Sequence, residues 1–125
     1  MFSHVMVGAA DMDEAKRFYD AVFGAMGGQP GIVDGNGRLV YMHNDGLFLV
    51  TTPINGEGAC HANGGTIGFG MADPAQADAW HAAGVAAGGT TCEDPPGVRE
   101  SAYGALYLAY LRDPTGNKLC ALHRM

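Results

Sequence analysis

Side chains suited to acid–base or anion chemistry occur near the start and in the last quarter of this chain. A histidine can exchange a proton near neutral pH, and an arginine fork or a tyrosine hydroxyl can hold the oxygens of an anion. A cysteine is either a reactive thiol, if neighbouring cations such as Lys118 lower its pKa, or a small buried hydrophobic residue. The candidates of these kinds are His4, Arg99, Tyr110 and Cys120, and both interpretations of Cys120 remain open.

Arg99 follows Pro95-Pro96, which restrict the backbone of its loop. A stiff loop is a good carrier for a residue that contacts a charged ligand, and Tyr103, a little further on, is a second candidate contact. Arg99 is also flanked by Glu93-Asp94 and Glu100, which could form surface ion pairs with it. The sequence therefore leaves two roles open for Arg99, ligand contact and surface ion pair.

The elements that must position these residues fall into two similar halves. In the first half an alternating strand pattern leads to Asp11, a helix N-cap, and Glu14 three residues later predicts a capping box. Gly27-Gly28 ends the helix. The strands expected in this half are residues 3–9, 38–43 and 47–52, with a hairpin turn at 44–46.

The second half repeats this order. Asp73 is the N-cap, Pro74 takes the first helical position, Gln76 stands where Glu14 stood, and Gly88-Gly89 ends the helix. The spacing predicts that this helix turns Ala77, Trp80, Ala83 and Val85 toward one side. The strands expected here are residues 65–72, 105–112 and 118–123, with the last turn at 113–117.

The two halves also match in numbering. Phe18 and Trp80 each lie seven residues after the capping aspartate of their half, and His4 and Thr66 each lie seven before it. We therefore expect one α+β domain over residues 1–125. Its parts are a first module at 1–52, a flexible connector at 53–64 and a second module at 65–125.

Side chains of a strand alternate between its two faces. The bulky residues of the two opening strands should therefore lie under the helices, and the other face should be more open. Gly68 lies on that other face, where a strand glycine marks either close approach by a ligand or a tight sheet crossing. The expected helix-side set is Val5, Val7, Ile67, Phe69 and Met71, and the opposite set is His4, Met6, Gly8, Thr66, Gly68 and Gly70.

Composition excludes several classes of protein. A hydrophobic share of 47% suits a globular domain, and no stretch approaches the roughly 20 apolar residues of a membrane span. The net charge of -6, with seven scattered Lys and Arg residues, argues against a nucleic-acid partner, and the lack of such a span argues against a membrane partner. The start lacks the pattern of a signal peptide, and three widely spaced cysteines form no CxxC motif. We therefore expect a cytoplasmic protein.

With these elements in place, the chain resembles the vicinal oxygen chelate superfamily, which includes glyoxalase I, bleomycin-resistance proteins, fosfomycin-resistance enzymes and extradiol dioxygenases. The resemblance implies two βαβββ modules whose sheets curve around a cavity, and a homodimer for a chain of this length. The residues that carry it are His4-Val5 before Asp11, Arg17-Phe18-Tyr19, Phe69 and Asp73, and above all the run from Asp113 to Leu119.

The resemblance also implies where a metal would be bound. Metal-using members place ligands on the first, fourth, fifth and last strands. These points fall on His4, the apolar run 47–50, Thr66 and Cys120, so only the first keeps the expected ligand type. A catalytic site needs about three protein ligands. We therefore expect no cofactor and no divalent metal, although recruitment of a metal through His43 or His61 remains open.

The last hairpin decides which tyrosine faces the cavity. A three-residue turn with Gly116 left-handed places Tyr110 opposite Cys120, whereas a four-residue loop places Tyr107 on that face. Gly116 favours the first form, and by resemblance a tyrosine at this place contacts an anionic substrate in the fosfomycin-resistance enzymes. The alternative is that both tyrosines are ordinary strand aromatics.

The predicted function is binding of a small polar or anionic organic molecule in the sheet cavity, with lyase or transferase chemistry if the protein is an enzyme. One alternative is a non-catalytic drug-binding protein like the bleomycin-resistance relatives. Another is a metal-dependent lactoylglutathione lyase or dioxygenase. The predicted catalytic residues are His4, Tyr110 and Cys120, and the predicted ligand contacts are Thr66, Gly68, Arg99 and Tyr103.

Overall fold

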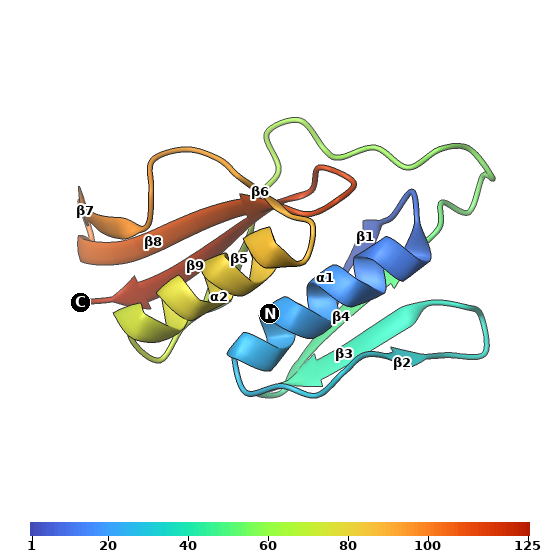
Figure 1. Ribbon diagram of the computed structural model, residues 1–125, viewed down its shortest axis with the longest axis horizontal. Helices are drawn as coiled ribbons and strands as arrows, with labels where there is room; N and C mark the ends of the chain where they lie inside the picture. The colour runs from blue at the N-terminus through green and yellow to red at the C-terminus, as the bar shows by residue number, and fades with distance from the viewer.

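The computed structural model describes residues 1–125, which form two helices and nine strands (Figure 1). The helices lie side by side, and each packs on the sheet built by its own half of the chain. Neither helix is long and apolar enough to cross a membrane. The elements are β1 (Val5–Gly8), α1 (Met12–Ala25), β2 (Ile32–Val33), β3 (Leu39–His43), β4 (Gly46–Thr51), β5 (Ile67–Gly70), α2 (Pro74–Ala86), β6 (Thr90–Thr91), β7 (Gly97–Ser101), β8 (Gly104–Arg112) and β9 (Lys118–Arg124).

The strands form two separate sheets. Sheet A has the order β1-β4-β3-β2, and sheet B has the order β5-β9-β8-β6, with β7 also paired to β8. In each sheet the opening strand runs parallel to the last strand of its half, and the last two strands form an antiparallel hairpin. The expected pair of βαβββ modules is thereby confirmed. β1 and β5 are edge strands, because each pairs with one neighbour only.

Both helices begin at the predicted aspartates. Asp11 Oδ1 accepts the backbone N–H groups of Asp13 and Glu14 at 2.9 and 3.0 Å, which satisfies two of the helix's free donors. Asp73 Oδ1 accepts the Gln76 N–H at 2.7 Å. The reciprocal bond of a capping box forms in the second half, from the Ala72 N–H to Gln76 Oε1 at 2.7 Å. The predicted capping box at Glu14 is not completed, because its carboxylate receives no hydrogen bond.

One core joins the two halves. Phe18 of α1 and Trp80 of α2 are fully buried, as predicted. The helices meet at Gly84, where a Cβ atom would lie 2.3 Å from Leu111 Cδ1 and 3.2 Å from Phe18 Cε2. The sequence-based expectation for this helix was wrong at Val85, which is 45% exposed, because the buried stripe passes through the adjacent glycine.

The two main hairpins turn differently. The β3–β4 hairpin uses a two-residue turn in which Asn44 and Asp45 both have positive φ, 47° and 64°. In the β8–β9 hairpin the Asp113 N–H donates to the Asn117 carbonyl at 2.9 Å, so three residues form the loop. Gly116 in this loop has a φ of 103°. The predicted three-residue turn is therefore confirmed.

The loop 113–117 also ties the second half to the first. The buried Asp113 carboxylate accepts the Tyr19 hydroxyl of α1 at 2.6 Å and Asn117 Nδ2 at 2.8 Å. Asn117 Nδ2 also donates to the carbonyl of Gly8 at 3.0 Å, and the Ala10 N–H donates to Thr115 Oγ1 at 3.0 Å. The loop 113–117, which belongs to the most specific motif of the sequence, therefore holds the two modules together, and we call it the clamp.

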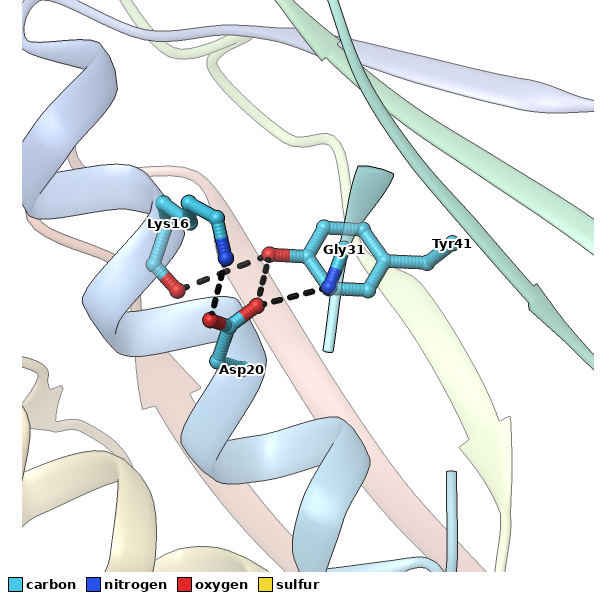
Figure 2. A network of polar contacts seen from close by, with 4 residues as sticks. All are labelled: Lys16, Asp20, Gly31 and Tyr41. Carbon is cyan, nitrogen blue, oxygen red and sulfur yellow. Dashed lines mark hydrogen bonds and ion pairs between the residues drawn. The ribbon is translucent and has the colours of Figure 1, made fainter. Parts of the chain in front are cut away.

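A second polar network fixes the segment that leads to β2 (Figure 2). The Asp20 carboxylate accepts hydrogen bonds from the Lys16 ammonium at 2.6 Å, the Gly31 N–H at 2.8 Å and the Tyr41 hydroxyl at 2.8 Å. Burial would raise the pKa of Asp20, but these three donors together lower it. Position 31 must be glycine, because a Cβ there would lie 2.5 Å from Tyr41 Cζ. The network is a structural joint between α1 and sheet A.

Candidate functional site

A cleft of about 480 Å³ lies between the opening strands of the two sheets. Its floor is aromatic, since the ring centroids of Phe23 and Phe69, and of Phe48 and Phe69, are each 5.6 Å apart. Its volume is in the range of small-molecule pockets, about 300–1,000 Å³. His4 and Val5 line it from the β1 side, and residues 67–70 line it from β5.

His4 lies at this cleft with an exposed side chain. Its Nδ1 atom is 2.8 Å from Ser3 Oγ, and the other side chains of the predicted site make no hydrogen bond with it. His43 lines the same cleft, whereas His61 lies beside Gly116 in the last turn. Two of the three histidines considered for a site therefore line one cleft, and the third lies elsewhere.

The second part of the site is the face of sheet B that points away from α2, which we call the open face of sheet B. Strand register places Gly68, Cys120 and Tyr110 side by side on this face. A Cβ atom at Gly68 would have no neighbouring atom within 4 Å. The predicted register is confirmed, and Gly68 also lines the cleft.

The choice between the two tyrosines is settled by the same register. Tyr110 lies opposite Cys120, as predicted. Tyr107 lies on the helix side of β8, where its hydroxyl donates to Asp78 Oδ1 of α2 at 2.7 Å. Tyr107 therefore serves to join α2 to its sheet.

Four cations share the open face of sheet B with Tyr110, including Arg124, which pairs with Leu106 of β8. The Lys118 ammonium is 5.1 Å from the centroid of the Tyr110 ring. Arg99 pairs in register with Leu106, and its guanidinium lies over Gly97, donating to the carbonyls of residues 94 and 95 at 3.0 and 2.8 Å. Arg112 pairs with Lys118 and donates to the carbonyl of residue 116 at 2.7 Å. Four of the seven Lys and Arg residues thus lie on this face.

The two thiols and the Tyr110 hydroxyl near these cations are held neutral. Burial raises the pKa of the Cys120 thiol, although the neighbouring Tyr110 hydroxyl acts in the opposite direction. Burial likewise raises the pKa of the Cys92 thiol. The pKa of Tyr110 is raised by burial and then by the charges of Cys120 and Glu93. These thiols therefore favour the protonated form, which is a poor nucleophile.

Two predicted ligand contacts lie at the margin of this arrangement. Thr66 immediately precedes β5 and is exposed. Tyr103 lies in the turn between β7 and β8, is 86% exposed, and donates its backbone N–H to Ser101 Oγ at 3.1 Å. The structure brings neither side chain into contact with Tyr110 or Cys120, so their roles stay predictions.

The residues at the expected metal-ligand points do not make a three-donor site within the chain. His4 is exposed beside the cleft, and Cys120 is a buried thiol in the other sheet. Phe48 and Leu49 occupy the fourth-strand point with buried apolar side chains. No three His, Cys, Asp or Glu side chains lie close enough together to hold an ion. This donor set does not suit a divalent cation.

Sequence reasoning named Lys118 only as a possible neighbour of Cys120 and Glu93 only as a neighbour of Arg99, and assigned neither to the ligand site. Lys118 precedes Cys120 by two residues, so strand alternation alone could have placed it beside Tyr110. Glu93, which forms an ion pair with Lys118, had no such signal, because it comes after the short strand β6 and reaches across two strands.

Comparison with known proteins identifies the family. No protein-family model and no curated protein matches the sequence. Among solved structures, a glyoxalase/bleomycin resistance protein/dioxygenase family enzyme from Burkholderia phytofirmans PsJN has 19% identity and a TM-score of 0.73, with 98% of each chain covered. A lactoylglutathione lyase from Agrobacterium tumefaciens has 22% identity and a TM-score of 0.67, covering 98% of this chain and 92% of that one. These two share the fold.

A third solved structure is much closer in sequence. It is a glyoxalase/bleomycin resistance protein from Albidiferax ferrireducens T118, with 59% identity, 99% of each chain covered and a TM-score of 0.95. The paired βαβββ modules and the turn motif at 113–117 already pointed to the same group. The chain therefore belongs to the glyoxalase/bleomycin resistance protein family.

Proposed function

We propose that this protein binds a small anionic organic molecule on the open face of sheet B, without a divalent metal. The observation that carries the proposal is the grouping of Arg99, Arg112 and Lys118 around Tyr110 in a chain of net charge -6. An anion gains charge-assisted hydrogen bonds from such groups, which are about twice as strong as neutral ones. Gly68 leaves the space that a ligand would need.

The adjoining cleft would take the apolar part of the same molecule. Phe23, Phe48 and Phe69 offer an aromatic floor, and Gly68 of the edge strand β5 both lines this cleft and lies on the face that carries the cations. A mostly apolar cleft with a few polar groups that fix orientation is the usual form of a small-molecule site.

Any chemistry would use His4, whose imidazole is exposed at the cleft. A histidine there can move a proton on a bound substrate, while Tyr110 and Arg99 hold its oxygens. Lyase or transferase activity would follow from that division of roles. Sequestration without reaction is the alternative, and it needs only the cations and the cleft. Turnover of a bound compound separates the two.

We also propose that the protein is a homodimer. The support is that β1 and β5 leave unpaired edges, and that Met6, Ile32 and Met42 on the face of sheet A away from α1 are 47%, 61% and 67% exposed. Open strand edges and exposed apolar groups are the surfaces that association covers.

Isothermal titration with a panel of small carboxylates and phosphonates, beginning with phosphonoacetate, tests the binding proposal. Replacing Arg99 by Ala should weaken the best ligand by about 1.5–3 kcal/mol, the value of a hydrogen bond to a charged group. Arg38→Ala is the control, because Arg38 is paired with Asp34 in the other half. Equal affinity in the Arg99 variant would refute the proposal. Elemental analysis of the purified protein should show well under one metal per chain.

A further inference from the structure

Glu93 and Lys118 form an ion pair over the open face of sheet B. The Lys118 ammonium is thus held between the Glu93 carboxylate and the Tyr110 ring, whose centroid is 5.1 Å away. The side chains of Lys118 and Glu93 remain 23% and 45% exposed, so solvent reaches the pair. An ion pair that is open to water is weak and can be exchanged for another partner.

The backbone at Glu93 is in the left-handed region, with a φ of 57°. The other non-glycine residues with positive φ are Asn44 and Asp45, which form a hairpin turn that requires this conformation. Glutamate has no such preference, and strained residues of this kind cluster at functional sites. This residue with left-handed backbone is the one whose carboxylate pairs with Lys118.

The charges around this pair are one-sided. Arg99, Arg112, Lys118 and Arg124 bring four positive charges to the open face, and Glu93 is the carboxylate that forms an ion pair with Lys118. The neighbouring thiols carry no compensating charge, since burial favours their neutral form. The Glu93 carboxylate therefore occupies the position where an anion is most strongly attracted.

We propose that Lys118 is the anion-recognition residue of this face, and that Glu93 is a resident counter-ion which the anionic group of the ligand displaces. This inference rests on the proposed function. The ligand group is a carboxylate, phosphonate or phosphate, because each presents oxygens to an ammonium as Glu93 does. A ligand must then bind Lys118 more strongly than the Glu93 carboxylate does, so weakly charged molecules do not displace Glu93.

Titration with inorganic phosphate at constant ionic strength tests this, with circular dichroism to confirm folding of each variant. Glu93→Gln should bind phosphate about fivefold more tightly than the unmodified protein, the equivalent of losing one exposed ion pair. Lys118→Met should weaken phosphate at least about tenfold. Combining the two substitutions should abolish the gain from Glu93→Gln, because that gain acts through Lys118.

The control is Glu100→Gln, which removes an equal charge from an exposed residue on the opposite face of β7. It should leave phosphate affinity within about twofold, because an exposed charge at that distance is screened. Equal tightening in both glutamate variants, or none in Glu93→Gln, overturns the inference. If Arg99→Ala still weakens binding in that case, the proposed function survives. Absence of anion binding in every variant refutes both.

Discussion

The open faces of the two sheets differ in chemistry although their strands are arranged alike. On sheet A the strand positions of this face are apolar apart from Thr51, with Met6 beside Leu49 and Met42 beside Leu47. On sheet B the corresponding face carries four cations and Tyr110. A repeated βαβββ frame therefore sets where side chains point, and residue identity makes one face suited to association and the other to anions.

The turns that close the two sheets differ as well. Asn44 and Asp45 close the β3–β4 hairpin with their own backbone and make no side-chain hydrogen bond to the other half. In the β8–β9 hairpin, Asp113 and Asn117 bind groups of α1 and β1. The second half holds the first in place through its last turn, and the first half has no equivalent clamp.

The largest expected effect is on this clamp. Asp113→Ala removes the acceptor of the Tyr19 hydroxyl, the Asn117 amide and three backbone N–H groups. Donors left buried without a partner should cost about 3 kcal/mol or more of the free energy of unfolding, as measured by urea denaturation. Glu57→Gln, at an exposed residue of the connector, is the control. A loss below about 1 kcal/mol would show that the clamp is not needed.

Adding one carbon at each of two glycines compares a packed position, Gly84, with an open one, Gly68. Gly84→Ala should cost about 1–3 kcal/mol, because the added carbon would lie 2.3 Å from Leu111 Cδ1 between the helices. Gly68→Ala should change the free energy of unfolding by less than about 0.5 kcal/mol, because nothing lies within 4 Å of that position. Urea unfolding of both variants measures this. A similar cost at the two positions would mean that the face at Gly68 is not open.

The apolar face of sheet A can be tested by adding a charge. Met42 is 67% exposed in the single chain, and Met42→Lys should weaken the proposed dimer about tenfold while the chain stays folded. Light scattering over a dilution series gives the mass, with Ile54→Lys in the connector as the control. Should the unmodified protein show the 13.0 kDa mass of one chain at all concentrations, the dimer proposal would be wrong.

The smallest expected effect concerns acid stability. In the folded protein the pKa of Asp20 is lowered, because three donors outweigh its burial. A lowered pKa gives stability that is present above the unfolded value, about 3.9, and is lost as the pH falls through the folded value.

Asp20→Asn should therefore reduce stability at pH 7 and make it less dependent on pH below about 4. The pair with Lys16 is partly exposed, so the difference should be about 0.5 kcal/mol. Urea midpoints at pH 7 and pH 3 measure it. Asp78→Asn is the matched variant of the second half, where the carboxylate accepts one exposed tyrosine hydroxyl, and its effect should be smaller. A larger effect there would reverse the comparison.

Much of this protein was determined by local rules that a sequence carries. Asp11 and Asp73 cap the helices because a short carboxylate reaches the first free N–H groups of a helix in any context. The positive φ of Gly116 selects the three-residue form of the last turn. This form sets the register of β8 and β9, which places Tyr110 opposite Cys120. Alternation along the strands then follows from the pleat.

Only the tertiary structure decided how the two halves meet. Gly84 rather than Val85 is buried because the crossing of α1 and α2 admits no side chain there. His4 lies at the cleft, in a different sheet from Tyr110, because β1 and β5 do not pair with each other. Such contacts join residues far apart in the chain, and they depend on volumes and directions that no spacing rule encodes.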